Sequence, residues 1–527
     1  MILDAQKGLG GEPSRYDVCI VGAGAAGITF ALQFDATPLR VCLLEAGGAS
    51  YEPLTQRLLE GDVVAAQYPA LRNTRLSAFG GSTNVWAGWC RPLEPLDFEA
   101  RDWCSAGGWP FGFDELRAYY TRAHDVCGLA AFDYDPAHWA GVLGEPRLLA
   151  RNTTFTNQIF HAQIQNFGHR YSDQLARSKN IDLVLHAPIM NLRVEHGACK
   201  AVRVRTLQRH EFAISAAYYV LAAGGIENAR LLLLSAESPE AASGNAHGLV
   251  GRYFTDHPFV DPGFLVLRER DSLDFYRLRP VASRPGASSV RGVLSLHREV
   301  VEREHLMQAA FFFHPRYESH PAFASPEVKA FLRLWNKFKN RAVPGAGWPY
   351  LRRAARAPHQ VLLALARKLA VGDGLAHRWL MRAMFETEFR FDNRVTLSDE
   401  YDQLGRRRVR VEWQLGQSDI DNMRRVTRLL DQAIRESGVG HLELVFADEP
   451  SAWRQATEGG LHHMGTTRMH RKPEHGVVDE NSRVHGTSNL FVAGSSVFPS
   501  GGYANPTLTI VALALRLGDH LKRVVSH

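Results

Sequence analysis

The sequence predicts an α/β protein with a doubly wound parallel sheet, built from separated segments of the chain. Three segments predict that sheet, since each reads as a short buried strand, then glycine, then a helix. They begin at Tyr16, Tyr218 and Asn489. Between the segments that begin at Tyr218 and Asn489, the chain is rich in strand patterns. This stretch predicts an inserted α+β domain, with an antiparallel sheet flanked by helices.

The first segment carries the most specific motif. An apolar run, residues 18–21, is followed at once by Gly22, Gly24 and Gly27 in G-x-G-x-x-G spacing. Gly22 permits a tight turn, Gly24 lets backbone approach a pyrophosphate, and Gly27 lets the helix pack on the strand. The motif predicts a dinucleotide site, with the pyrophosphate at the helix N-terminus. The alternative is a glycine-rich turn without a ligand.

A second apolar run, residues 41–44, ends at Glu45. In a parallel sheet this carboxylate is placed to accept hydrogen bonds from a ribose 2′-hydroxyl, and it would repel a 2′-phosphate. Strand, glycines, helix, second strand and acid together favour the dinucleotide interpretation.

The other two segments repeat this logic. Residues 218–221 read as a strand that ends in Ala222-Ala223-Gly224-Gly225 before a helix, which predicts a second wall of the site or a plain βα unit. Residues 489–493 end at Gly494, and a helix over 507–517 opens at Asn505-Pro506. The end of the chain therefore returns to the parallel sheet.

A loop over 79–91, FGGSTNVWAGWCR, offers two glycines, short polar groups and two indoles. It is either a ligand-contacting loop or an ordinary surface loop with buried indoles. Further patterns predict a small antiparallel unit, two later strands and one amphipathic helix capped by Ser418 or Asp419. The antiparallel unit would comprise residues 181–194, 201–204 and 211–214. The two later strands would be residues 395–397 and 409–413, and the helix residues 420–437.

One insertion, residues 329–382, holds twelve Lys or Arg and one acidic residue, Asp373. Aromatic residues are interleaved with these charges, among them Trp335, Phe338, Trp348, Tyr350 and Trp379. The pattern favours a helical lid with a solvated basic face over a surface that docks on a membrane or an acidic partner. Nucleic acid is not expected, because no reading motif accompanies the charge.

Composition limits the remaining classes. The sequence contains no run of eighteen apolar residues, so no membrane span is expected. The start of the chain does not resemble a secretory signal. The six cysteines form no C-x-x-C pair, so no metal site is expected, and a reduced, cytoplasmic protein is predicted. The net charge of +6 is a weak pointer to anionic partners.

These stretches together resemble the glucose–methanol–choline (GMC) family of flavoprotein oxidoreductases over nearly the full length. The resemblance rests on the N-terminal motif and on GGSTNVWAG, YYVLAAGGIENARLLL, VGRYFTDHP, NRVTLS, HHMGTTRM and GGYANPTLT. The branch with pyranose oxidase and bacterial sugar dehydrogenases is the most similar. The family implies FAD as cofactor, a Rossmann-like FAD-binding domain, and oxidation of a CH–OH group to a carbonyl.

The resemblance also implies domain bounds. The FAD-binding domain would comprise residues 1–150, 185–262 and 455–527, the last carrying the catalytic residues. Residues 151–184 would lie on the substrate side, and residues 263–454 would form the substrate-binding domain, including the basic insertion.

The family's H-x-x-G-T pattern falls on His462, Gly465 and Thr466. His462 is therefore the expected catalytic base, with His463 as its rival, and Asn505 falls on the family's second catalytic position. Some relatives attach FAD covalently through a histidine in the glycine loop; Asn84 stands in this loop, so non-covalent FAD is expected. Asp256-His257 is a recurrent family signature and is interpreted as structural.

The cofactor-contacting residues expected from motif and resemblance fall in five groups. They are Gly22, Ala23, Gly24, Ala25 and Gly27; Glu45 and Ala46; Gly81, Ser82, Thr83, Asn84 and Trp86; Ile189, Ala223 and Gly224; and Gly494, Ser495, Asn505, Pro506 and Thr507.

The expected chemistry is removal of the hydroxyl proton by His462, a hydrogen bond from Asn505 to the same oxygen, and hydride transfer to flavin N5. The alternatives are a flavin-dependent lyase and a catalytically inactive flavin-bound interaction protein; a nicotinamide enzyme is disfavoured. The substrate would be a sugar, glycoside, polyol or other alcohol, and the electron acceptor oxygen, a quinone or another protein.

Overall fold

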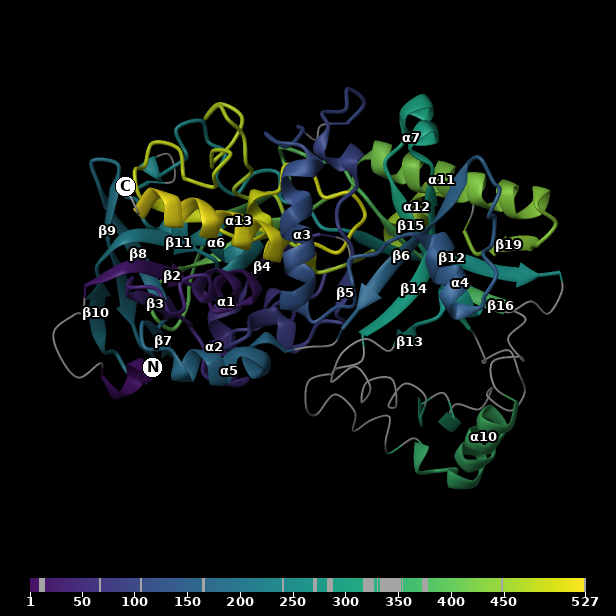
Figure 1. The fold of residues 1–527 in the computed structure, drawn as a ribbon, viewed down its shortest axis with the longest axis horizontal. Helices are drawn as coiled ribbons and strands as arrows, with labels where there is room; N and C mark the ends of the chain where they lie inside the picture. Colours follow the sequence, from purple (N-terminus) through teal and green to yellow (C-terminus); the bar gives the residue numbers. More distant parts are fainter. Residues whose placement is uncertain are drawn as a thin grey trace.

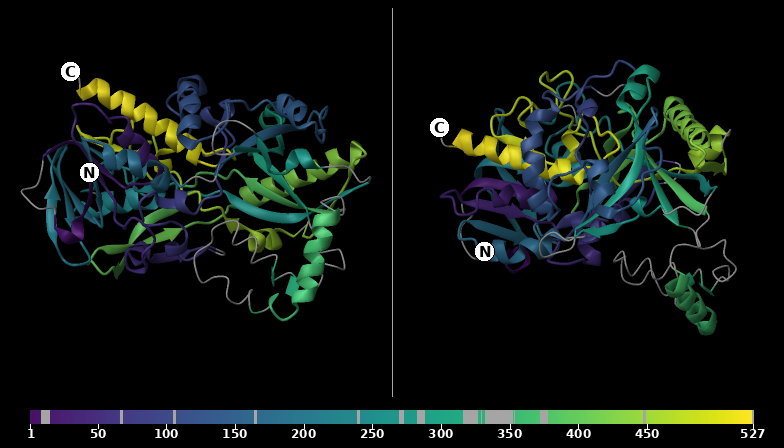
Figure 2. Two further views of the ribbon diagram at one scale, coloured as in Figure 1. Left: turned by 60° about the horizontal axis from the view of Figure 1, so that its bottom comes forward. Right: turned by 45° about the vertical axis from the view of Figure 1, so that its right-hand side comes forward.

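The computed structural model describes most of the chain in an elongated molecule with a parallel sheet at one end and a large antiparallel sheet at the other (Figure 1). Both termini lie at the parallel-sheet end, as the views in Figures 1 and 2 agree. The described residues are 1–8, 15–65, 68–104, 107–163, 166–238, 241–268, 273–281, 288–315, 327–328, 330–331, 352, 354–371, 378–446 and 449–525.

The parallel sheet has six strands in the order β1-β7-β3-β2-β11-β21, and all five pairings are parallel. Its strands are β1 (Ile2–Asp4), β2 (Tyr16–Val21), β3 (Val41–Leu44), β7 (Ile181–Leu185), β11 (Ala216–Leu221) and β21 (Leu490–Val492). The three strand–glycine–helix segments therefore lie side by side in one sheet, as predicted. Every residue of β21, five of the six residues of β2 and the last three residues of β11 are buried.

Three helices follow these strands at their carboxyl ends: α1 (Ala25–Leu32), α6 (Gly224–Leu234) and α13 (Thr507–Val525). Helix α1 packs on α13, which in turn packs on α3 (Phe113–Cys127). The remaining helices are α2 (Pro53–Gln56), α4 (Pro136–Leu143), α5 (Phe167–Arg177), α7 (Arg298–Glu304), α10 (Pro358–Val371), α11 (Gln417–Glu436) and α12 (Pro450–Ala456).

The small antiparallel unit is smaller than predicted. It comprises β8 (Ile189–Glu195), β9 (Ala198–Arg205) and β10 (Glu211–Ile214). Strand β7, which the sequence grouped with this unit, pairs in parallel with β1 and β3 instead. A short apolar strand of five residues fits a parallel or an antiparallel sheet, so the residue pattern could not decide which sheet β7 joins. Residues 181–184 thus lie in the parallel sheet, although they were expected on the substrate side.

The large sheet has nine strands, and every pairing in it is antiparallel. Its main path is β19-β12-β16-β15-β14-β6-β5, with β13 beside β14 and β20 beside β12. The strands are β5 (Trp89–Cys90), β6 (Phe155–Ala162), β12 (Pro258–Leu267), β13 (Arg279–Val281), β14 (Ser288–Leu296), β15 (Ala309–Pro315), β16 (Arg378–Phe385), β19 (Gly440–Leu444) and β20 (Glu458–Gly459).

Helix α11 shares an apolar core with this sheet, so the predicted combination of an antiparallel sheet with a helix is confirmed. The helix begins at Gln417, after Gly416, and not after Ser418 or Asp419 as predicted. Asp419 lies in the first turn, where its carboxylate accepts a hydrogen bond from the Gly416 amide at 2.7 Å. The cap prediction was wrong because an acidic residue suits the third helical position as well as the cap.

A third sheet joins distant segments. Strands β17 (Arg394–Tyr401) and β18 (Arg407–Glu412) form a hairpin, and β18 pairs in parallel with β4 (Gly61–Val64). This hairpin was expected in the substrate-binding domain. It shares a core instead with Leu71 and with Ile226 of α6, because its apolar face needs a partner that the nine-stranded sheet does not supply.

The basic insertion is shorter than predicted. Residues 378–382 belong to β16, inside the nine-stranded sheet, and Trp379 is buried there. Arg382 pairs with Asp261 on the neighbouring strand at 2.7 Å. Trp335, Phe338, Trp348 and Tyr350 lie outside the described residues. Helix α10 lies apart from the sheets (Figures 1 and 2).

Candidate active site

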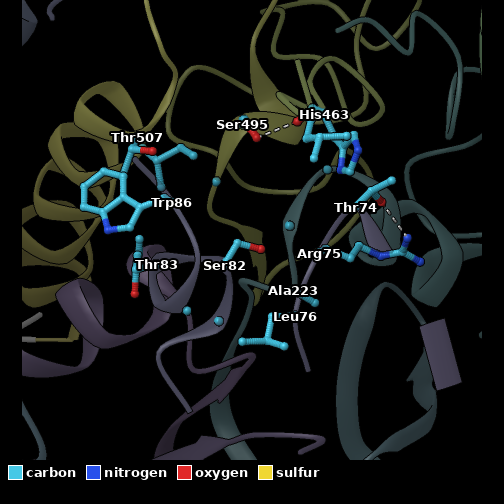
Figure 3. A pocket seen from close by; sticks show the side chains of 18 of the residues that line it. Thr74, Arg75, Leu76, Ser82, Thr83, Trp86, Ala223, His463, Ser495 and Thr507 are labelled. Carbon is cyan, nitrogen blue, oxygen red and sulfur yellow. Dashed lines mark hydrogen bonds between the residues drawn. The ribbon is translucent and has the colours of Figure 1, made fainter. Parts of the chain in front are cut away.

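A cavity of about 830 Å³ is lined by residues of both large sheets. Its volume lies within the range of about 300–1,000 Å³ typical of ligand and cofactor sites. The carboxyl ends of the parallel strands supply part of its wall, which is where ligands bind in open α/β sheets. Figure 3 shows side chains around this cavity, among them Trp86, Ser82, Ser495, His463 and Arg75.

The turn between β2 and α1 forms one part of the wall. Gly22 has φ +104°, and a Cβ there would lie 2.6 Å from the Ala222 carbonyl oxygen. A Cβ on Gly27 would lie 1.9 Å from the Gly22 carbonyl oxygen. Both glycines are therefore required by packing of the protein itself.

Gly24 is different. A Cβ there would meet no protein atom nearer than the Gly81 Cα, at 3.9 Å, and Gly24 lines the cavity. Protein packing therefore does not demand a glycine. A ligand that lies against the backbone does, at the N-terminus of α1, where the first amides lack intrahelical acceptors.

Glu45 is buried at the end of β3 and lines the cavity. Its carboxylate accepts hydrogen bonds from the amides of Ala23, at 3.1 Å, and Gly47, at 2.9 Å. Burial raises the pKa of this carboxyl, and the backbone hydrogen bonds oppose that shift. Each oxygen has capacity for a further donor, as a ribose acceptor requires.

The glycine loop forms a short 3₁₀ helix over Gly81–Asn84. Gly81, Ser82, Thr83 and Trp86 line the cavity, whereas Asn84 does not. The Asn84 amide nitrogen donates to the Phe79 carbonyl at 3.0 Å, so this side chain holds the loop. The expected contact between Asn84 and the cofactor is thus not seen.

The remaining expected cofactor residues are placed as follows. Ala23 and Gly27 do not line the cavity: Ala23 holds Glu45, and Gly27 makes room for the Gly22 carbonyl. Those that line it are Gly22, Ala25, Ala46, Ile189, Ala223, Gly224, Gly494, Ser495, Asn505, Pro506 and Thr507.

His462 and Asn505 meet at the cavity. They come from segments on either side of β21, and the Asn505 amide nitrogen lies 3.0 Å from His462 Nε2. On its other side, His462 Nδ1 lies 2.9 Å from Nδ1 of His257. Nε2 of His257 lies 2.9 Å from the Gly502 carbonyl oxygen.

This chain of contacts assigns the protons. A carbonyl can only accept, so His257 carries its proton on Nε2 and, when neutral, presents a bare Nδ1. His462 must then donate from Nδ1, which leaves Nε2 as its acceptor. Asn505 donates to that nitrogen through its amide N–H. His462 is therefore held in the tautomer that a general base needs, with its lone pair at the cavity.

Asp256 fixes the backbone that carries His462. Its carboxylate accepts from the amides of Leu461, at 2.9 Å, and His462, at 2.7 Å, and from the Tyr68 hydroxyl, at 2.7 Å. Leu461 has φ +64°, a left-handed conformation that these bonds hold in place. Asp256 and His257, interpreted as structural from the sequence, thus contact the expected base directly.

Burial governs the titration of this group. Burial lowers the pKa of His462 well below its usual value, and the neighbouring His257 and His463 lower it further. Burial also lowers the pKa of His257 to about 4. Burial raises the pKa of Asp256 to about 6, against its hydrogen bonds. Near neutral pH both imidazoles are neutral, which is the state that the proton assignment requires.

His463, the rival base, also lines the cavity (Figure 3). Its backbone carbonyl accepts from the Ser495 hydroxyl at 2.6 Å. Its Nε2 is buried without a hydrogen-bond partner among the described residues. Burial, followed by the charge of Arg75, lowers its pKa to about 3. No described hydrogen bond orients this ring, which contacts only the rings of Tyr68 and Phe254 among the described aromatic residues, in contrast with His462.

Sequence reasoning missed several residues of the wall, among them Arg75, Arg291, Phe312 and Arg382. The last three stand on strands of the nine-stranded sheet. These three residues lie in no sequence motif. Strand register decides which side chains of a sheet face a cavity, and register cannot be read from a short stretch of sequence. Asp256 and His257, which contact His462, stand in a recurrent family signature, and this signature was the sequence signal that could have identified them as its partners.

The residues present fit FAD. The glycine turn, the buried acid after β3 and the N-terminus of α1 match an adenosine diphosphate group. Gly24 leaves space that protein atoms do not use, and Ser77 lines the cavity with a buried hydroxyl that has no described partner. The catalytic pair lines the same cavity, so a flavin beside it would be within reach of the substrate.

Residues 390–514 match the model of the GMC oxidoreductase family. A 2-methyl-1,2-propanediol dehydrogenase of Mycolicibacterium austroafricanum is 24% identical, over 97% of this chain and 95% of its own. A pyranose 2-oxidase of Tricholoma matsutake is 39% identical over 69 residues, which are 13% of this chain and 12% of its own.

The fold is also that of solved oxidases. The crystal structure of pyridoxine 4-oxidase from Mesorbium loti superposes with a TM-score of 0.59 at 18% identity, over 96% of this chain and 99% of that one. The family model covers the segment with both expected catalytic residues, and the full-length likeness covers the rest. By motif, fold and similarity, the chain resembles the GMC oxidoreductases, whose family model matches its residues 390–514.

Proposed function

We propose that this chain oxidises a hydroxyl group of a sugar, glycoside, polyol or other small alcohol to a carbonyl, with His462 as the base. The observation that carries the proposal is the geometry at His462 Nε2. This nitrogen is an acceptor held by a fixed tautomer, 3.0 Å from an amide donor, in a cavity that fits FAD.

When substrate binds, its hydroxyl replaces the Asn505 amide as the hydrogen-bond partner of His462 Nε2. An imidazole nitrogen has one lone pair, so Asn505 cannot keep it while a hydroxyl donates there. In the complex the hydroxyl donates its proton to Nε2, and the Asn505 amide turns to donate to the same oxygen. Negative charge that develops on that oxygen meets a donor already in position.

His257 and Asp256 both hold His462 in place. When Nε2 takes the proton, the ring becomes a cation whose Nδ1–H is still accepted by His257. The carboxylate of Asp256 accepts a hydrogen bond from the His462 amide at 2.7 Å, so it holds the backbone that carries this ring. Both groups act on His462 and not on the substrate, so they are positioning residues.

Bound FAD supplies the acceptor at flavin N5 for the hydride that leaves the substrate carbon as the carbonyl forms. This chain contributes the base, the oxyanion donor and the dry walls. The flavin is expected to be non-covalent, because the glycine-loop residues that line the cavity are Gly81, Ser82, Thr83, Val85 and Trp86, and none is a histidine.

The relatives support the hydroxyl class. They include a diol dehydrogenase over the full length and a pyranose oxidase over a short stretch. Neither name supports a lyase, and the intact His462–Asn505 pair does not favour an inactive interaction protein. Oxygen, a quinone and a protein remain the acceptors to be tested by flavin reoxidation.

The test is anaerobic reduction of the flavin by sugars, glycosides, polyols and aryl alcohols, followed in a stopped-flow spectrometer. His462→Ala should keep its yellow flavin and be reduced roughly 100- to 10,000-fold more slowly. Asn505→Ala should be slowed by a comparable or smaller factor, up to about 1,000-fold. His463→Ala, the matched control from the next position, should retain most activity.

The two histidines make the outcome decisive. If His463→Ala is inactive and His462→Ala is reduced normally, the roles must be exchanged. If neither substitution slows flavin reduction, the proposed mechanism is wrong.

Among the described residues, no helix combines the length and apolar character that crossing a bilayer requires. A cytoplasmic location stays a prediction from the sequence. Contact between the basic insertion and an acidic surface also stays a prediction, and salt-sensitive binding to acidic vesicles would test it.

A further inference from the structure

A buried arginine lies in the part of the cavity wall that the nine-stranded sheet supplies. Arg291 of β14 is 4% exposed and lines the cavity. Its guanidinium donates from Nε to the Tyr276 carbonyl at 3.0 Å and from Nη2 to the Phe313 carbonyl at 2.9 Å. Its Cζ also lies 5.3 Å from the ring centre of Trp89 and 5.2 Å from that of Phe312.

No described carboxylate balances the charge of Arg291. The buried Arg101, Arg230 and Arg406 are paired with carboxylates, Arg101 with Glu386 and the other two with Asp402. The buried Arg468 also has no described carboxylate partner, but it does not line the cavity. Burial lowers the pKa of Arg291 to about 9, and no acidic neighbour offsets that shift. A buried cation without a counter-charge is costly, so a site of this kind gains from a ligand that brings a negative charge.

One nitrogen of Arg291 is left for such a ligand. Nε and Nη2 are used by backbone carbonyls, whereas Nη1 has no hydrogen-bond partner among the described residues. Nη1 is also not among the fully buried unsatisfied atoms of the described chain. It therefore keeps access to the cavity that its side chain lines.

Arg291 is connected to the catalytic pair by a row of side chains. Phe312, which packs on Arg291, faces Arg382 across the β15–β16 ladder. The Cζ of Arg382 lies 5.9 Å from the ring centre of Phe259, and that ring centre lies 6.2 Å from the ring centre of His462. Both ends of this row, Arg291 and His462, line the same cavity.

We propose that the substrate carries an anionic group, a carboxylate or a phosphate, that accepts a hydrogen bond from Arg291 Nη1 while its reacting hydroxyl lies at His462. The proposal rests on the proposed oxidation of a hydroxyl group. Arg382 is a poorer anchor, because its guanidinium is already paired with Asp261 at 2.7 and 2.9 Å. The competing interpretation is that Arg291 only ties β14 to its neighbouring carbonyls.

Calorimetric titration of the oxidised holoenzyme separates the two interpretations without turnover. The probes are matched pairs: galacturonate with galactose, glucuronate with glucose, and glucose 6-phosphate with glucose. At least one anionic member should bind tenfold or more tightly than its neutral partner. The carboxylate and phosphate pairs show which anion is preferred. Equal or weaker binding of every anionic member overturns the proposal.

Variants locate the effect. Arg291→Gln should remove the anionic preference, and Arg291→Lys should retain part of it. Arg382→Gln, which removes a charge already balanced by Asp261 from the same wall, should change the preference less than threefold. Flavin content and the melting temperature verify folding, and the wild-type comparison holds even if Arg291→Gln does not fold. A preference that survives in folded Arg291→Gln overturns the role of Arg291.

Flavin reduction by the same probes keeps the two proposals apart. If neutral sugars reduce the flavin and anions bind no better, the anionic site is wrong and the alcohol oxidation stands. If anions bind through Arg291 but no alcohol reduces the flavin, the binding site stands and the oxidation mechanism is wrong.

Discussion

The two walls of the cavity are built in different ways. The wall from the parallel sheet consists largely of backbone, with glycines at Gly22, Gly24 and Gly224 and helix N-termini beside them. The wall from the nine-stranded sheet consists of large side chains, such as Phe259, Phe312 and Arg291. A backbone wall suits a constant ligand such as a cofactor, whereas a side-chain wall can vary with the substrate.

This difference also separates binding from chemistry. Changes to the backbone wall should decide whether the flavin is present, because a new Cβ fills cofactor space. Changes around His462 should leave the flavin in place and alter how fast it is reduced. Four predictions follow from this division, and the substitutions among them run from the largest expected effect to the smallest.

Gly24→Val should abolish FAD binding while the protein stays folded. The new side chain would project into the cavity, where a Cβ meets no protein atom within 3.4 Å. Circular dichroism should match the wild type, and the purified protein should be colourless. Gly141→Ala, in α4 with open space around it, is the control and should remain yellow. A yellow Gly24→Val protein would contradict the backbone-wall interpretation.

The same preparation tests the attachment of the flavin. Acid precipitation of the wild type should release yellow FAD into the supernatant. A yellow pellet would mean covalent attachment, and the cavity-lining residues would then have to be searched for the attaching group.

His257→Phe should slow flavin reduction by roughly 10- to 100-fold, the loss typical when a partner that orients a functional histidine is removed. Phenylalanine keeps the ring volume but cannot accept the proton of His462 Nδ1, so the tautomer is no longer fixed. Flavin content and substrate affinity should stay near wild type, which a general loss of folding would not allow. An unchanged reduction rate would remove His257 from the mechanism.

The pH profile of flavin reduction should have its acid limb below 6.5. His462 works as a base only when it is unprotonated, and burial lowers its pKa. The active form therefore persists as the pH falls through the usual histidine range, and the rate declines only when the lowered pKa is reached. Stopped-flow reduction between pH 4 and 9 measures this. In His463→Ala the limb should rise slightly but stay below 6.5, because burial, the main cause of the lowered pKa, remains. An acid limb above 6.5 would contradict the geometry.

The sequence determined the cofactor side of this protein nearly alone. Strands β2, β3, β11 and β21, the glycine turn and Glu45 were predicted near their observed bounds, whereas α13 begins at the predicted Thr507 but continues past the predicted 517 to Val525. Local signals suffice there, because a glycine with positive φ, an apolar strand and an acid at a strand end each carry their meaning in a few residues. His462 and Asn505 followed from a family resemblance and not from spacing.

Tertiary structure alone decided the rest. It moved β7 into the parallel sheet and joined β17–β18 to β4, because a short apolar strand pairs wherever its buried faces find partners. It also brought His257 to Nδ1 of His462, 205 residues away, and Arg291 to the cavity wall. Such contacts depend on register and sheet order, which no short stretch of sequence encodes.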